Sequence, residues 1–405
     1  MMPRCRSYSC LVSSFVALVA CVPSAADTTD EPPSSTSQGE TSASTPTTSS
    51  GTQTSETSSG EGTTIPDTST GGMSTDATST STSTSTSTST STTAAESTTT
   101  TGETTGGMLC EGSDSEGRGI LPGPEAPSCD PANYTVQNLV YAPGDFHGLD
   151  LYRPKGAGPF PTVVWIHGGG WKSGSKADVL QARRLVCRGY AVASIDYRLS
   201  GTAVFPAQIQ DVKAAIRFLR ANAGTYDLDP QRFASFGSSA GGHLAALAGV
   251  ASDVEAFDDP KLGDVQVSAA VQAMVVWYGP SNLAAMDPQL IDQGCPSAKH
   301  GQPDSAESQL LGCTVSAPEC ADAVAAADPH TYVDASDPPA LLLHGSEDCL
   351  VPFGQSATLF ATLVDAGVCA EYRKVTGVAH GGPEWQSGPV QDVLAAYLDQ
   401  RFSAP

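Results

Sequence analysis

Hydrophobic positions beyond about residue 130 follow two alternating periods. Short apolar or β-branched runs, typical of strands, lie at residues 162–166, 190–195, 233–236, 269–277, 340–344 and 371–375. Amphipathic helical patterns lie between or after them, at residues 178–188, 205–221, 355–366 and 390–402. Strands that alternate with helices predict a mostly parallel sheet covered on both faces. Ligands of such sheets bind beyond the carboxyl ends of the strands.

Two stretches depart from this rhythm. Residues 134–141 and 149–152 alternate between apolar and polar positions, which predicts an antiparallel strand pair before the parallel strands begin. Residues 279–338 form a long polar connection that contains three cysteines. Because connections of this length usually have a function, we expect this segment to form a cap or a wall of the binding pocket.

The N-terminal part of the chain has a different composition. Residues 27–108 consist mostly of Thr, Ser, Gly, Glu and Asp, with a Ser-Thr alternation at 78–92. Such a segment cannot bury enough apolar surface to fold, so we expect a disordered stalk and a folded domain at 109–405. The formal net charge is −23, and about −15 remains once the acidic stalk is set aside. This charge argues against nucleic acid as a partner.

Residues 1–26 are predicted to be an export signal. Two arginines precede an apolar run at residues 11–20, which is too short to span a bilayer. The sequence Leu-Val-Ala-Cys, ending at Cys21, resembles the lipobox of bacterial lipoproteins, in which the cysteine is lipidated. The alternative is ordinary cleavage after Ala26, which leaves a soluble secreted protein. We expect export to the cell envelope, with membrane contact only through the lipid.

Eight of the 11 cysteines lie beyond the predicted signal, at Cys110, Cys129, Cys187, Cys295, Cys313, Cys320, Cys349 and Cys369. An even number in an exported chain predicts disulfides, and the spacing fits no zinc site. Cys110 with Cys129 and Cys349 with Cys369 are candidate pairs. Cys187 lies in a helical pattern and is equally compatible with a buried free thiol. The sequence leaves the pairing open.

Residues 237–241 (Gly-Ser-Ser-Ala-Gly) stand between a predicted strand and a predicted helix. This fits the Gly-x-Ser-x-Gly nucleophile elbow with Ser239 at its apex. Glycines are needed because the backbone passes close on both sides of a strained serine. The alternative is an ordinary turn between a strand and a helix, since short motifs also occur by chance.

Three more features lie at strand ends. Residues 167–171 (His-Gly-Gly-Gly-Trp) follow a buried strand, and a glycine turn there supplies N–H groups to an oxyanion hole. The predicted donors are Gly169, Gly170 and Ala240. After the strand at 340–344 come two candidate acids, Asp348 and Glu347. His380 follows the last strand, which completes the order Ser, acid, His.

Five motifs together resemble the α/β-hydrolase superfamily over almost all of residues 134–405. They are residues 166–171 (Ile-His-Gly-Gly-Gly-Trp), 196–199 (Asp-Tyr-Arg-Leu), 236–243 (Phe-Gly-Ser-Ser-Ala-Gly-Gly-His), 344–352 (His-Gly-Ser-Glu-Asp-Cys-Leu-Val-Pro) and 379–381 (Ala-His-Gly). The chain is most similar to bacterial feruloyl- and acetyl-xylan-type serine esterases, near the hormone-sensitive-lipase-like enzymes.

The resemblance implies an α/β-hydrolase fold with a mostly parallel eight-stranded sheet flanked by helices. The family pattern His-Gly-x-x-Asp-x-x-Val-Pro places the acid on Asp348 rather than Glu347. It also implies a catalytic triad of Ser239, Asp348 and His380, with no metal and no cofactor. The cysteine-rich segment 279–338, Cys349 beside the acid, and the stalk depart from the family pattern.

Three functions are compatible with these observations. The first is a serine esterase that forms an acyl-enzyme on Ser239 and acts as a monomer on small-molecule or polysaccharide-linked esters, such as those of plant cell walls. The second is an amide-cleaving hydrolase of the exopeptidase or arylformamidase type. The third is a surface binding protein without activity, against which the complete triad argues.

Overall fold

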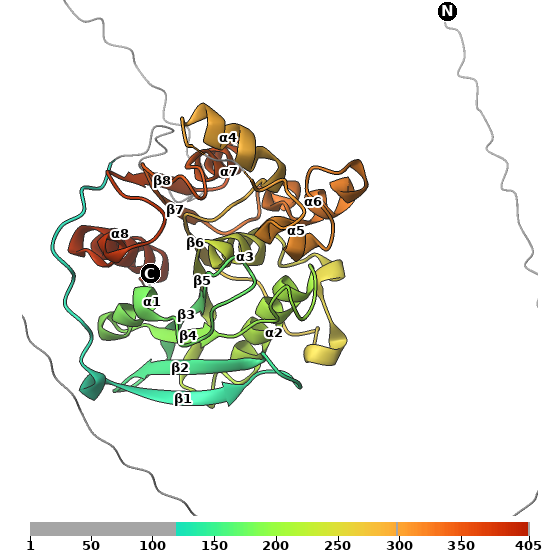
Figure 1. Ribbon diagram of the computed structural model, residues 1–405. Coiled ribbons are helices and arrows are strands. Elements are labelled where there is room, and N and C mark those ends of the chain that lie inside the picture. The colour runs from blue at the N-terminus through green and yellow to red at the C-terminus, as the bar shows by residue number, and fades with distance from the viewer. Residues whose placement is uncertain (1–118, 297–298, 404–405) are drawn as a thin grey trace, which may run out of the picture. The chain divides into compact units, whose positions relative to one another are not determined.

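The computed structural model describes residues 119–296 and 299–403. These residues form one eight-stranded sheet with the strand order β1-β2-β4-β3-β5-β6-β7-β8 (Figure 1). The strands are β1 (Tyr134–Val140), β2 (Gly148–Pro154), β3 (Phe160–Ile166), β4 (Ala191–Ile195), β5 (Leu228–Ser238), β6 (Ala273–Trp277), β7 (Ala340–Gly345) and β8 (Ala370–Val375). The predicted signal, Cys21 and the stalk lie outside the described residues.

The sheet is parallel except at one edge. β1 pairs with β2, and β2 with β4, in antiparallel register, while every later pair is parallel. The predicted α/β-hydrolase fold with a mostly parallel eight-stranded sheet is therefore confirmed. The central strands β3, β4, β6 and β7 are fully buried, apart from Pro161, as their apolar sequences predict.

Helices cover both faces of the sheet (Figure 1). The main helices are α1 (Leu180–Arg183), α2 (Ala207–Ala221), α3 (Ala240–Val250), α7 (Gly354–Asp365) and α8 (Gly388–Phe402). α1 and α8 share a core with one face, whereas α2, α3 and α7 pack on the other. The 3₁₀ helices outside the long connection are η1 (Pro131–Asn133), η2 (Arg184–Arg188), η3 (Glu255–Phe257), η4 (Pro260–Leu262) and η8 (Pro383–Gln386).

Three predicted elements have clearly different bounds in the structure. The predicted strand at 233–236 is the last part of β5, which begins at Leu228. The predicted helix at 178–188 is only one α-helical turn, α1, followed by η2, which ends where Gly189 adopts φ 92°. The predicted strand at 269–277 begins at Ala273. The carbonyls of Ser268 and Ala270 accept hydrogen bonds from the Arg220 guanidinium, so this segment is held by α2.

The long connection between β6 and β7 folds into short helices. They are α4 (Met286–Asp292), α5 (Ala306–Leu311) and α6 (Ala321–Ala327), with 3₁₀ helices η5 (Leu283–Ala285), η6 (Pro318–Cys320) and η7 (Pro329–Tyr332). We call this connection, residues 278–339, the insertion. Within the part of the chain that the structure describes, no helix is long and apolar enough to cross a bilayer.

One disulfide joins the insertion to the loop after β7, one lies within the insertion, and one joins the segment before η1 to η2. The pairs in which both cysteines belong to the described residues are Cys129–Cys187, Cys295–Cys349 and Cys313–Cys320. The two candidate pairs from the sequence are therefore wrong: Cys129 bonds to Cys187 rather than Cys110, and Cys349 to Cys295 rather than Cys369. Cys187 is not a free thiol. Nearness along the chain misled the prediction because the pairing depends on which segments the fold brings together.

Candidate active site

Ser239 occupies the turn between β5, which ends at Ser238, and α3, which begins at Ala240. Its backbone angles, φ 54° and ψ −126°, lie in a region that non-glycine residues rarely adopt. A Cβ atom on Gly237 would lie 2.1 Å from the carbonyl oxygen of Gly241, and one on Gly241 would lie 2.0 Å from that of Ile166. Both glycines are thus required by close backbone approach, which is the geometry expected of a nucleophile elbow.

The three residues predicted as a triad contact one another. The Ser239 Oγ lies 2.8 Å from His380 Nε2, and His380 Nδ1 lies 2.7 Å from Asp348 Oδ2. Ser239 follows β5, Asp348 follows β7 and His380 follows β8, so the parallel sheet places all three loops at the same edge. This hydrogen-bond chain can pass a proton from the serine to the imidazole while the carboxylate fixes the imidazole's tautomer.

Asp348 is held ionised by its surroundings. The side chain is fully buried, and its Oδ1 accepts hydrogen bonds of 2.9 Å from the backbone N–H groups of Leu350 and Val351. Burial alone would raise the pKa of this carboxyl. The interactions with His344 and His380 outweigh burial, so the pKa of Asp348 lies below its ordinary value. Glu347, the alternative acid, donates its backbone N–H to the carbonyl of Val378.

His344 is a second histidine against Asp348 that the sequence did not single out for this role. Its Nε2 lies 3.4 Å from Asp348 Oδ2 and 2.9 Å from the carbonyl oxygen of Val351, while its Nδ1 lies 2.7 Å from Ser356 Oγ. The sequence did carry one signal for this role: His344 is a single polar residue at the end of the apolar run Ala-Leu-Leu-Leu. It is fully buried, and a buried imidazole needs polar partners.

Tyr278 is another neighbour that sequence reasoning missed. Its ring centroid lies 4.8 Å from that of His380 and 4.3 Å from that of Trp385. The residue follows β6 directly and adopts φ 38°, a backbone conformation that a tyrosine rarely takes. Burial raises the pKa of Tyr278 to about 12, so the ring packs against the imidazole as a neutral group. The sequence carries no local pattern that predicts this contact.

The predicted oxyanion turn lies against the nucleophile. A Cβ atom on Gly168 would lie 3.3 Å from the Cβ of Ser239, and one on Gly169 would lie 2.2 Å from the carbonyl oxygen of Ser173. Gly169 and Gly170 both have positive φ, 110° and 59°. That the N–H groups of this turn receive an oxyanion stays a prediction from the sequence. Ala240, the third predicted donor, is the first residue of α3.

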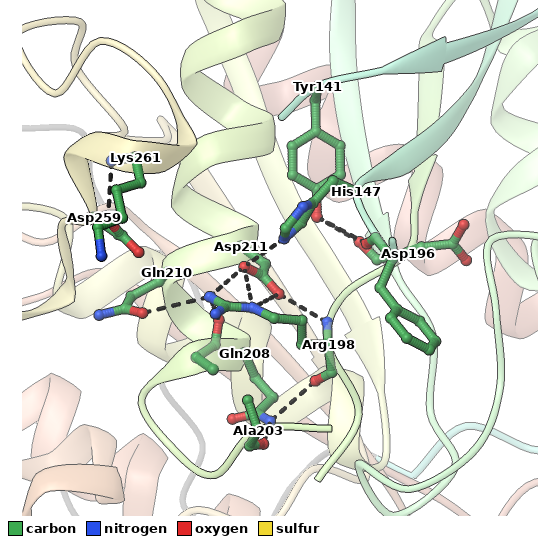
Figure 2. A network of polar contacts seen from close by, with 12 residues as sticks. Tyr141, His147, Asp196, Arg198, Ala203, Gln208, Gln210, Asp211, Asp259 and Lys261 are labelled. Atoms are coloured by element: carbon green, nitrogen blue, oxygen red, sulfur yellow. Dashed lines mark hydrogen bonds and ion pairs between the residues drawn. The ribbon is translucent and has the colours of Figure 1, made fainter. Parts of the chain in front are cut away.

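A network of polar side chains holds the residue that precedes this turn. The Tyr197 hydroxyl donates a hydrogen bond of 2.9 Å to the carbonyl of His167, and the two rings stack at 4.3 Å. The next residue, Arg198, binds both carboxylate oxygens of Asp211 on α2, and His147 approaches the same carboxylate at 3.2 Å (Figure 2). The motif at residues 196–199 therefore has a structural role, because Tyr197 holds His167, the residue before the predicted oxyanion glycines.

Two cavities meet at Ser239. Pocket A, about 300 Å³, is bordered by the oxyanion turn, the insertion and the acid loop, through Gly170, Trp171, Ala240, Ala306, Glu307 and Val351 among others. Pocket B, about 590 Å³, is bordered by Gly168, Gly169, Tyr278, His380 and Gly381 among others. Ser239, Gly170 and Leu350 border both. The expectation that the cysteine-rich segment forms a pocket wall holds for pocket A.

No set of three or more His, Cys, Asp or Glu side chains in residues 119–296 and 299–403 is arranged to hold a metal ion. The chemistry that the described residues can perform at Ser239 is nucleophilic attack on an acyl group with general acid–base assistance. The oxyanion donors, the triad roles and the absence of a cofactor remain predictions from the sequence.

Comparison with known proteins gives a consistent picture. The family model BD-FAE matches residues 149–363. The protein named esterase LipQ of Mycobacterium tuberculosis is 32% identical over 273 residues, which cover 64% of this chain and 59% of LipQ. Esterase LipC of the same organism is 30% identical, covering 65% of this chain and 64% of LipC. The chain thus spans about six tenths of the length of these curated relatives.

Solved structures are also similar. A truncated carbohydrate esterase from gut microbiota is 32% identical, with a TM-score of 0.61, and the match covers 68% of this chain and 99% of that one. A thermophilic esterase of Thermogutta terrifontis is 26% identical, with a TM-score of 0.52, over 65% of this chain and 92% of that one.

Proposed function

This chain belongs to the BD-FAE family, and on that premise we propose that it hydrolyses carboxylic esters through an acyl-enzyme on Ser239. The observation that supports the proposal most directly is the continuous hydrogen-bond chain from Ser239 through His380 to Asp348. The named esterases among its relatives agree with it. Proposed substrates are small-molecule or polysaccharide-linked esters.

We assign each step of the proposed reaction to a named group of the chain. His380 Nε2 takes the Oγ proton as Ser239 attacks the carbonyl carbon, and Asp348 stabilises the imidazolium that results. The N–H groups of Gly169, Gly170 and Ala240 receive the developing oxyanion. His380 then gives its proton to the leaving alcohol oxygen. Water, activated by the same imidazole, releases the acid and restores the serine.

The two pockets receive different halves of the ester in this reaction. The leaving oxygen must accept a proton from His380, so the alcohol group belongs on the side where His380 is exposed, which is pocket B. Pocket A borders Ser239 and Ala240 without His380 and is the place for the acyl group. Pocket A is also the smaller cavity, at about 300 Å³ against about 590 Å³.

The test is hydrolysis of 4-nitrophenyl butyrate together with labelling by a fluorophosphonate. We expect turnover and a single adduct on Ser239, and a loss of about 10⁵-fold or more in kcat for Ser239→Ala. One Thermogutta terrifontis esterase structure is described as phosphonylated by cyclosarin, which supports the choice of probe. No turnover of short-chain esters together with no adduct contradicts the proposal. Faster cleavage of the matched butyryl anilide would favour the amide-hydrolase alternative.

We also propose that the chain is exported and carries a lipid on Cys21. The apolar run before the Leu-Val-Ala-Cys sequence supports export. The three disulfides among the described residues fit an oxidising compartment. Mass spectrometry of the mature N-terminus should find a diacylglyceryl group on Cys21, and a mature chain that starts with the free amine of Asp27 contradicts the anchor.

A further inference from the structure

Leu350 is a large apolar residue that stays exposed beside the proposed nucleophile. It is 55% exposed, and together with Ser239 and Gly170 it borders both pocket A and pocket B. Its backbone N–H is engaged in a hydrogen bond to Asp348 Oδ1, so most of the exposed surface belongs to the side chain. Single apolar residues on a protein surface need no explanation. This one, however, stands where two cavities meet at the serine, which is where a bound ester has to lie.

The backbone that carries Leu350 is held in place. Asp348 Oδ1 accepts hydrogen bonds of 2.9 Å from the N–H groups of both Leu350 and Val351. The carbonyl oxygen of Val351 lies 2.9 Å from His344 Nε2. Cys349, the preceding residue, carries the disulfide to the insertion. A side chain on a backbone that is already fixed can contact a substrate with little loss of conformational entropy.

The surroundings of Leu350 match an acyl chain better than an alcohol group. Its neighbours Cys349 and Val351 border pocket A and not pocket B. Pocket A also includes the apolar residues Pro280 and Ala306. The wall of pocket B is more polar and includes Ser173, Asp178, Gln181 and Ser238. Leu350 therefore continues the apolar wall of pocket A up to the nucleophile.

We propose that Leu350 is a specificity-determining residue that packs against an apolar acyl chain of the substrate. The inference rests on the proposed esterase function and on the placement of the acyl group in pocket A. Pro280 and Val351 in the same wall are buried and Ala306 is half-buried, so Leu350 offers more apolar surface for a substrate to cover. Removing that surface from water favours binding in proportion to its area. An acetyl group covers little of it, whereas a longer acyl chain covers more.

The test compares 4-nitrophenyl butyrate with 4-nitrophenyl acetate. Because the two esters share a leaving group, the ratio of their kcat/KM values measures what the two additional methylenes gain. We expect Leu350→Ala to lower this ratio about fivefold, since the shorter side chain offers less apolar surface. Leu350→Met keeps an apolar side chain of similar volume and should stay within about twofold of the wild type. Leu350→Asn is similar in size but polar, so it should behave like Leu350→Ala.

Ile291→Ala is the matched control for the alanine variant. Ile291 lies on α4 of the insertion, is 67% exposed and is not among the residues that border either pocket. This variant should leave the ratio unchanged. Because Leu350 and Ile291 are both exposed, both alanine variants should unfold at close to the wild-type temperature.

A role of Leu350 that acts only through Asp348 gives a different outcome. The variants of residue 350 keep its backbone N–H, and a shift of the acid loop would lower kcat on both esters alike and leave the ratio unchanged. A Leu350→Ala ratio equal to that of the wild type, or an equal fall in Ile291→Ala, overturns the proposal while esterase activity stands. Failure of the proposed function is distinct, because then the wild type hydrolyses neither ester.

Discussion

At the scale of single residues, Gly241 shows how closely the backbone is packed at the elbow. We expect Gly241→Ala to abolish activity and to destabilise the fold by about 3 kcal/mol or more, because its Cβ would overlap the carbonyl of Ile166. Gly224→Ala is the matched control, since nothing lies within 4 Å of its Cβ position. Urea unfolding should place that variant within about 1 kcal/mol of the wild type. Equal stability of the two variants would contradict the argument.

His344 is predicted to position Asp348 rather than to touch the substrate. Replacing it by Asn removes the contact with the carboxylate and should lower kcat about tenfold with little change in KM, the effect of one hydrogen bond to a charged group.

Asp348→Asn should cost about 10⁴-fold in kcat, since it removes the acceptor that fixes the His380 tautomer. Steady-state kinetics on 4-nitrophenyl butyrate measures both. An increase in KM alone for His344→Asn would assign it a different role.

At the scale of elements, the insertion is tied to the loop that carries the acid. Cys295 is bonded to Cys349, which follows Asp348 in the chain, and the Gln293 side chain donates a hydrogen bond of 2.7 Å to the Asp348 carbonyl. The Gln293 Oε1 accepts another of 3.1 Å from the N–H of Phe353. The acid loop is therefore held by the same segment that forms the wall of pocket A.

We expect the double variant Cys295→Ser, Cys349→Ser to lose both stability and kcat. Its disulfide spans 54 residues, which corresponds to about 4 kcal/mol in the chain-entropy model. The control removes Cys313–Cys320, which spans 7 residues, corresponds to about 2 kcal/mol and joins two residues of the insertion to each other. Thermal unfolding and kcat measurements should both show a larger loss for the Cys295→Ser, Cys349→Ser variant than for the control. A kcat equal to that of the control would mean that Gln293 alone holds the loop.

At the scale of the whole molecule, a buried neutral histidine links stability to pH. His243 in α3 is fully buried, with Nε2 2.6 Å from the carbonyl of Ala327, and burial lowers its pKa to about 4. In the unfolded chain the same group titrates near 6.5. Between these values the unfolded state binds more protons than the folded state, so stability falls as the pH falls from about 6.5 to about 4.

The measurement is urea unfolding of the wild type and His243→Gln at several pH values. The variant should be less stable at pH 7 because it loses packing against Trp171. The difference should shrink on acidification by up to about 1.4 kcal/mol per pH unit within the window, since only the wild type carries this histidine. A difference that stays constant from pH 7 to pH 4 would show that the pKa of His243 is the same in the folded and unfolded states.

Much of the architecture was accessible from the sequence. Strands buried on both faces must be apolar throughout, so the central strands were visible as apolar runs. Glycines at 168, 169, 237 and 241 marked places where backbone approaches backbone. The polar start of β5 and the short α1 were not visible. Pairing with β3 decides where β5 begins, and the turn at Gly189 limits the helical segment that starts with α1. Neither feature produces a periodic pattern in the sequence.

The sequence by itself determined the fold class and the order of the three proposed catalytic residues, because periodicity and turn chemistry are local properties of the chain. Only the tertiary structure decided the cysteine pairs, the contacts of His344 and Tyr278 with the triad, and the place of Leu350 at the border of both pockets. These depend on distances between segments that are far apart along the chain. No local pattern of residues encodes such distances, so they appear only when the sheet brings the loops to one edge.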